Sequence, residues 1–187
     1  MIIGLTGRKG SGKSTVAQLM KDTYDYEIMG FGDTIKKMLA AMGVPLENLM
    51  NPQKKEEEVP GFGKSARFMM QTLGTEWARD IISDSVWLTV MDKRLEGTQA
   101  TLGSKIVIDD VRFSNEAEFI RKKGGKVVHI RRRFDPHEED HVSEKGLHPD
   151  EIDATIDNVS CYTTDLLCGL KQYMEDSNNG LIHLTQP

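Results

Sequence analysis

The most informative stretch of this chain for its fold is Ile2–Gln18, IIGLTGRKGSGKSTVAQ. Its first residues are apolar and predict a buried strand, and its last residues predict the start of a helix. Between them lies GRKGSGKS, residues 7–14, which satisfies the pattern G-x-x-x-x-G-K-[ST]. A glycine loop between a strand and a helix can turn successive N–H groups toward one centre, and the helix adds its positive N-terminal end. The stretch therefore predicts a phosphate-binding loop.

The residue types of this loop indicate a nucleoside triphosphate with Mg²⁺. Lys13 can reach the β- and γ-phosphates, and the Ser14 hydroxyl can ligate the metal. An incidental glycine-rich turn is the alternative, and the complete motif in a strand–loop–helix context disfavours it. The predicted nucleotide contacts are Gly10, Ser11, Gly12, Lys13, Ser14 and Thr15.

Composition narrows the class of protein. The 187 residues suit one domain, residues 1–187, and the net charge of −5 argues against a nucleic acid polymer as partner. No apolar run approaches the ~20 residues that cross a bilayer, so we expect no membrane association. The N-terminal residues lack the pattern of a secretory signal, which predicts a cytoplasmic protein. Cys161 and Cys168 are expected to be buried thiols. Whether the protein forms a homodimer is a question that the sequence leaves open.

Four further segments predict strands, at residues 26–31, 105–110, 126–130 and 154–157. The segments between and after these strands contain apolar residues at helical spacing or residues typical of helix caps. We expect an α/β fold, with an open, mainly parallel five-stranded sheet and helices on both faces, as in P-loop NTPases. The expected later helices are 34–42, 65–82, 85–95, 114–123 and 160–174.

Charged residues follow two of these strands. Asp109 and Asp110 end an apolar run, and ligands gather beyond the carboxyl ends of parallel strands. One of the two carboxylates can approach Mg²⁺ through water or bind substrate; the alternative is a turn-initiating pair. Residues 131–133 are three arginines that can clamp phosphates, or form a solvated basic cluster.

Three other segments suggest a substrate site. Residues 44–64, rich in proline, glycine and charge, predict a surface excursion. Residues 134–150 are rich in histidine and acidic residues, and since they lack the paired Cys/His framework of a zinc site, we favour a lid over a metal site. In the 65–82 helix a polar residue recurs every four positions, which gives either a binding wall or an ordinary exposed face. These residues are Arg67, Gln71, Thr75 and Arg79.

The chain resembles the bacteriophage deoxynucleoside monophosphate kinases, within the P-loop nucleoside monophosphate kinase group. A phage-encoded protein of this kind would be expected in the host cytoplasm. The phosphate loop is generic, and the ordered presence of the other segments carries the resemblance. They are FGDTIK at 31–36, Arg67 with QTLGTE at 71–76, DVRF at 110–113 with Glu116, HIRR at 129–132, HVSEKGL at 141–147 and IDN at 156–158.

The resemblance implies ATP-dependent phosphorylation of a deoxynucleoside monophosphate with Mg²⁺. It implies catalytic roles for Lys13, Asp110 and Arg132, and basic substrate-loop residues at Lys54 and Lys55. It also implies that Lys13 and a larger set surround the monophosphate. This set is Arg67, Gln71, Gly74, Thr75, Trp87, Asp110, Arg112 and Glu116.

Two alternatives stay open. A dephospho-coenzyme A kinase has a similar phosphate loop and a similar IDN segment, but phosphorylates a sugar hydroxyl and needs a general base, for which Asp33 is the candidate. A nucleotide-gated binding module without phosphotransfer is the other. It would need a water-orienting residue and a partner surface, neither of which the sequence indicates.

Overall fold

The computed structural model describes residues 1–98, 104–132, 146–158 and 163–178. By its contacts the chain divides into two compact units, and each is described by itself. Unit 1 comprises residues 1–30 and 98–187, and unit 2 comprises residues 31–97. No helix among the described residues is long and apolar enough to span a membrane.

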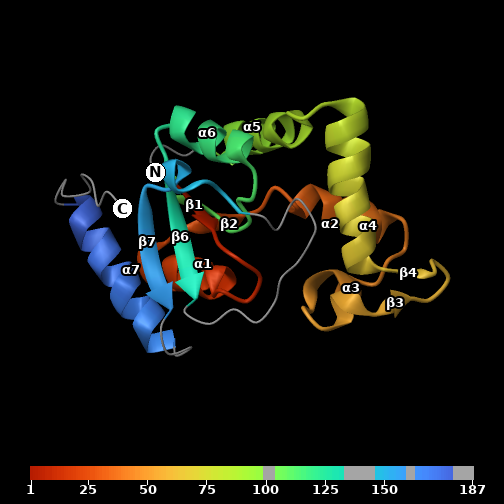
Figure 1. Ribbon diagram of the computed structural model, residues 1–187, viewed down its shortest axis with the longest axis horizontal. Coiled ribbons are helices and arrows are strands. Elements are labelled where there is room, and N and C mark those ends of the chain that lie inside the picture. Colours follow the sequence, from red (N-terminus) through yellow and green to blue (C-terminus); the bar gives the residue numbers. More distant parts are fainter. Residues whose placement is uncertain (99–103, 133–145, 159–162, 179–187) are drawn as a thin grey trace. The chain divides into compact units, whose positions relative to one another are not determined.

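Unit 1 is built on a parallel sheet (Figure 1). Its five strands lie in the order β2-β5-β1-β6-β7, and every neighbouring pair is parallel. The predicted α/β fold with a five-stranded sheet is therefore confirmed. The strands are β1 (Ile2–Thr6), β2 (Glu27–Met29), β5 (Ile106–Ile108), β6 (Lys126–Arg132) and β7 (Ala154–Asn158).

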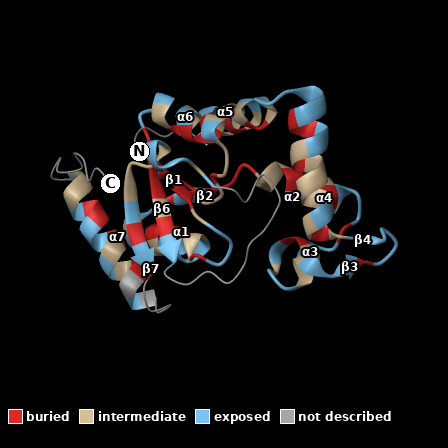
Figure 2. Ribbon diagram, in the orientation of Figure 1, coloured by how far each residue is buried: buried red, intermediate tan, exposed pale blue. Residues whose placement is uncertain are grey.

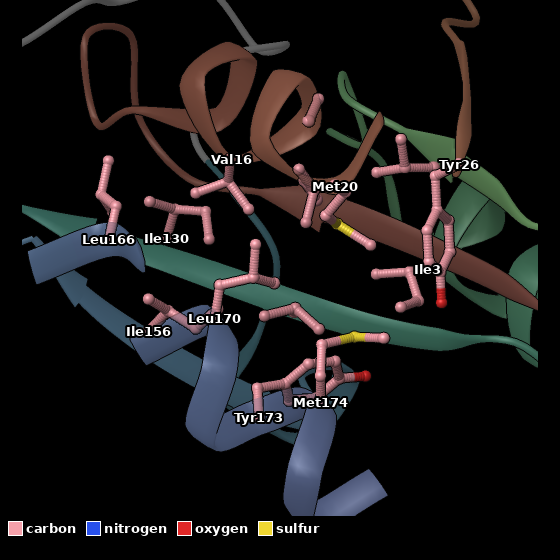
Figure 3. Close-up of a cluster of buried hydrophobic side chains, with 14 residues drawn as sticks. Ile3, Val16, Met20, Tyr26, Ile130, Ile156, Leu166, Leu170, Tyr173 and Met174 are labelled. Atoms are coloured by element: carbon pink, nitrogen blue, oxygen red, sulfur yellow. The ribbon is translucent and has the colours of Figure 1, made fainter. Parts of the chain in front are cut away.

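Helices pack on both faces of this sheet because its strands alternate their side chains. On one face α1 (Lys13–Tyr24) and α7 (Thr163–Asn178) cover Ile3 and Ile130, with Val16 of α1 and Leu170 of α7 in the same cluster (Figure 3). On the other face α6 (Ser114–Lys122) packs over Gly4, where a Cβ atom would lie only 2.5 Å from Ile120 Cδ1. Figure 2 shows the buried residues concentrated along β1 and β6 and on one side of α7.

Two details of unit 1 differ from the sequence prediction. Strand β6 continues through Arg131 and Arg132, which were expected beyond its end, because both residues pair in register with β7. Cys168, expected in the core, is exposed, since α7 turns Leu166 and Leu170 toward the sheet instead. Cys161 lies outside the described residues.

Unit 2 is largely helical and contains the predicted excursion. Residues 44–64 form short ordered elements with buried side chains at Val44, Leu49 and Val59. The elements of the unit are α2 (Asp33–Ala41), α3 (Leu46–Met50), the 3₁₀ helix η1 (Lys54–Glu56), the hairpin strands β3 (Glu58–Val59) and β4 (Lys64–Ser65), α4 (Ala66–Thr72), η2 (Leu73–Ile82) and α5 (Val86–Thr98).

The predicted 65–82 helix is one helical segment with two geometries. Ser65 caps α4 by accepting the Phe68 N–H at 3.2 Å, and from Leu73 the helix widens to π geometry. Polar residues every four positions drift around an α-helix, which has 3.6 residues per turn. Gln71, Thr75 and Arg79 do not share one exposure in the structure, because Gln71 and Thr75 are partly exposed whereas Arg79 is buried.

Candidate functional site

The phosphate loop leaves β1 at Thr6 and enters α1 at Lys13. Gly7, Gly10 and Gly12 all have positive φ angles, of 138°, 76° and 107°. A Cβ atom on Gly7 would lie 2.4 Å from the Ile130 carbonyl oxygen, and one on Gly12 would lie 2.9 Å from Leu166 Cδ1. Gly7 therefore requires glycine for space as well as for backbone angle, because a backbone carbonyl cannot move aside, whereas Gly12 requires it for its backbone angle.

Lys13 folds back over the loop that precedes it. Its Nζ atom donates to the Gly7 carbonyl at 2.5 Å and to the Arg8 carbonyl at 2.8 Å. Burial, followed by the positive charge of Arg112, lowers the pKa of the Lys13 ammonium group to about 8, while Asp109 and Asp110 act in the opposite direction. Lys13 therefore remains mainly charged at neutral pH, and three charged residues from beyond β5 lie near enough to influence it.

The chain after β5 is fixed beside the start of the phosphate loop. The Asp109 N–H donates to the Met29 carbonyl, and the Val111 N–H donates to the Leu5 carbonyl, both at 3.1 Å. These bonds place Asp109 and Asp110 at the carboxyl ends of β2, β5 and β1, as the sequence analysis expected. Both carboxylates are partly exposed at this edge.

Glu116 holds the backbone at Arg112. Its side chain is only 2% exposed, and its Oε2 atom accepts the N–H groups of Arg112 at 2.8 Å and Phe113 at 3.2 Å. A carboxylate near the start of a helix also interacts favourably with the helix dipole. The structure thus gives Glu116 a positioning role for Arg112, and its predicted contact with substrate stays a prediction.

Arg132 and Asn158 contact the phosphate loop from β6 and β7. The Nη1 atom of Arg132 donates to the Gly10 carbonyl at 3.0 Å, and Nδ2 of Asn158 donates to the Ser11 carbonyl at 2.9 Å. The Ser11 side chain is buried, so the loop presents this residue through its backbone. In the sequence Asn158 stands out only as the last residue of the IDN segment, and the resemblance implies no role for it. The feature that could have indicated a role is its position, because Asn158 is a polar residue directly after a predicted strand, and the carboxyl ends of parallel strands meet at one edge of the sheet.

Unit 2 carries the other predicted substrate contacts. Arg67 pairs with Glu56 through a bond of 2.5 Å from Nε to Oε1, and Gln71 and Thr75 lie partly exposed further along the same helical segment. Trp87 is 4% exposed, and its indole N–H donates to the Gly74 carbonyl at 2.7 Å. The roles of these residues toward a substrate stay predictions.

The last of the four polar residues that recur along residues 65–82 does not lie on an exposed face. Arg79 is buried and donates to the Asp84 carbonyl at 3.0 Å, next to the end of η2. Most of the predicted lid, residues 134–145, lies outside the described residues.

The parallel sheet and the glycine loop with its lysine define a P-loop kinase fold. Among solved structures, a dephospho-CoA kinase from Campylobacter jejuni is similar over 96% of this chain and 98% of its own, with a TM-score of 0.51 and 15% sequence identity. Identity this low supports the fold alone.

Sequence comparisons identify the family. The profile described as deoxynucleotide monophosphate kinase matches residues 55–164, a range that begins after the phosphate loop and therefore does not depend on that generic motif. A protein of Acanthamoeba polyphaga mimivirus assigned to the deoxynucleotide monophosphate kinases is 31% identical over 168 residues, covering 82% of this chain and 81% of its own. The deoxynucleoside-5'-monophosphate kinase of Escherichia phage T5 is 30% identical over 114 residues, covering 54% of this chain and 44% of its own. The chain belongs to the deoxynucleotide monophosphate kinase family.

Proposed function

We propose that the protein transfers the γ-phosphoryl group of ATP to a deoxynucleoside monophosphate, releasing ADP and the diphosphate. The main support is that Asp109, Asp110 and Arg112 lie near enough to Lys13, at one edge of the sheet, to shift the pKa of its ammonium group. The chain also belongs to the deoxynucleotide monophosphate kinase family. Lys13 at the phosphate loop and Arg112 after β5 could each bind one of the two phosphate groups that must approach each other. The carboxylates suit a metal or a substrate hydroxyl.

The residues present fit a magnesium ion. Ser14 is the second residue of α1, and two carboxylates lie after β5, whereas the described residues contain no cluster of three His, Cys, Asp or Glu side chains arranged to hold a metal. Mg²⁺ takes few protein oxygens and completes its shell with phosphate and water, which matches this sparse donor set. When bound, the ion would neutralise charge on the transferred phosphoryl group.

The chain's own residues would act by position and charge. The acceptor is already an anion, so the reaction needs two polyanions held in line more than it needs a strong base. Residues 10–15 would hold ATP, with Lys13 and Arg132 countering charge on the transferred group. Asp110 would orient the monophosphate, and Arg112 and Arg67 would bind its phosphate. The remaining proposed contacts are Gln71, Gly74, Thr75, Trp87 and Glu116.

Phosphotransfer to a sugar hydroxyl, as in dephospho-coenzyme A kinase, would need Asp33 as a general base. In the structure the Asp33 carboxylate pairs with Lys36 at 3.2 Å and with Arg94 at 2.9 Å. These two cations contact both of the oxygens that would have to accept the proton of a substrate hydroxyl. This pairing favours an acceptor that is already ionised.

A coupled assay of ADP release with a panel of acceptors tests the proposal. We expect turnover with one or more deoxynucleoside monophosphates and none with dephospho-coenzyme A. Lys13→Ala should lower this turnover by orders of magnitude while its circular dichroism spectrum matches that of the wild type. Turnover with dephospho-coenzyme A alone would refute the proposal, and ADP release that is independent of any acceptor would indicate a nucleotide-gated module.

A further inference from the structure

Two side chains from neighbouring strands hold successive carbonyl groups of the phosphate loop. Arg132 on β6 and Asn158 on β7 lie opposite each other in the register of the sheet. They donate to the carbonyls of Gly10 and Ser11 respectively. The last strand of the sheet is thereby bonded directly to the loop that begins the fold.

The contact between Asn158 and Ser11 is buried. Asn158 is 6% exposed and Ser11 is 1% exposed, and a Cβ atom on Gly12 would lie 3.1 Å from Asn158 Nδ2. The Ser11 carbonyl can only accept, so the amide nitrogen must face it. The Oδ1 atom of Asn158 has no hydrogen-bond partner among the described residues, and the bond to Ser11 is therefore what fixes the orientation of this amide.

This bond sets the direction of an N–H group in the loop. In a trans peptide unit the carbonyl of one residue and the N–H of the next point in opposite directions, and the described chain has no cis peptide. Drawing the Ser11 carbonyl toward β7 therefore turns the Gly12 N–H away from β7. Gly12 precedes α1, where N–H groups without a partner in the helix bind anions.

We propose that Asn158 is a positioning residue for nucleotide binding, which acts through the Ser11 carbonyl to hold the Gly12 N–H toward the phosphates of the nucleotide. The inference rests on the proposed function and adds a residue to its nucleotide site. Asn158 does not itself contact the nucleotide. Its loss should therefore weaken binding at the phosphate loop and leave the monophosphate site intact.

Asn158→Leu and Asn158→Ala both test this inference. Leucine keeps the approximate size of the side chain without its hydrogen-bond donor, and alanine is small enough not to clash with the phosphate loop. Titration calorimetry with ADP should show roughly tenfold weaker binding for each variant, the effect of losing one buried hydrogen bond. In steady-state assays the KM for ATP should rise by a similar factor, and the KM for the monophosphate should stay within about twofold of the wild-type value. Gln172→Leu, which removes an exposed amide on α7, should leave ADP binding unchanged.

A purely structural role for Asn158 predicts something else. In that case both substitutions would lower the thermal midpoint and the active fraction, and the KM for ATP would not rise by a larger factor than the KM for the monophosphate. Equal rises in both KM values, or unchanged ADP affinity in the two folded variants, would overturn the inference alone. A wild-type chain that does not bind ADP would overturn the proposed function as well.

Discussion

The charge state of Lys13 should make nucleotide binding depend on pH. Burial beside Arg112 places the pKa of this ammonium group at about 8 in the free protein. A bound phosphate favours the charged form, so the charged form binds ADP more tightly and the pKa rises in the complex. From a pKa of about 8, the charged fraction falls from roughly nine-tenths at pH 7 to roughly one-tenth at pH 9. ADP binding should weaken about tenfold over that range.

Titration calorimetry with ADP in metal-free buffer measures this dependence across the pH range. Lys13→Arg is the matched control because it keeps its charge throughout, and Lys13→Met removes the charge at every pH. Neither variant should show the tenfold change. A wild-type affinity that is constant from pH 7 to pH 9, or that declines by the same factor in both variants, would refute the assignment of Lys13 as the titrating phosphate ligand.

Substitutions at Gly7, Trp87 and Glu116 test the packing of the predicted site residues by chemical denaturation, with Trp77 as a control position. Gly7→Ala should lower the free energy of unfolding by about 1–3 kcal/mol, because its Cβ atom would clash with a backbone carbonyl at a positive φ; an unchanged midpoint would contradict the loop geometry. Trp87→Phe should cost about 1–3 kcal/mol through the lost indole hydrogen bond, whereas Trp77→Phe, at a side chain 40% exposed, should change stability by less than about 0.5 kcal/mol. Equal effects of the two would show that the buried bond is unimportant. Glu116→Ala should cost about 2–3 kcal/mol and Glu116→Gln less, since glutamine keeps an acceptor for the two N–H groups; equal losses would argue against this role.

Much of the fold could be predicted from local sequence. The apolar runs of β1 and β5 and the complete phosphate-loop motif give strong signals, and they led to the parallel sheet. Strand β6 was predicted too short because its last residues, Arg131 and Arg132, are charged. Their extended conformation depends on pairing with β7, which lies far along the chain. The hairpin of β3 and β4, with two residues per strand, is too short to show a periodicity.

The candidate site was harder to predict, because several side chains bond to backbone groups that the sequence does not reveal. Asp109 and Asp110 were placed correctly at a strand end, since that position follows from the apolar run before them. The buried side chains of Trp87 and Glu116 bond to the Gly74 carbonyl and to the backbone after β5, and no local pattern in the sequence indicates these partners. The link from Asn158 to the phosphate loop likewise depends on sheet order, which brings the last strand next to β6.

A crystal structure with ADP and a deoxynucleoside monophosphate bound together would show whether two phosphate groups bind opposite each other, as the proposed mechanism requires. We predict the ADP phosphates against Lys13 and the loop amides, with the second phosphate held by Arg112 and Arg67 and facing the first. A complex in which the monophosphate lies remote from Arg67, Asp110 and Arg112 would contradict the proposed kinase mechanism, even with ADP bound in the loop.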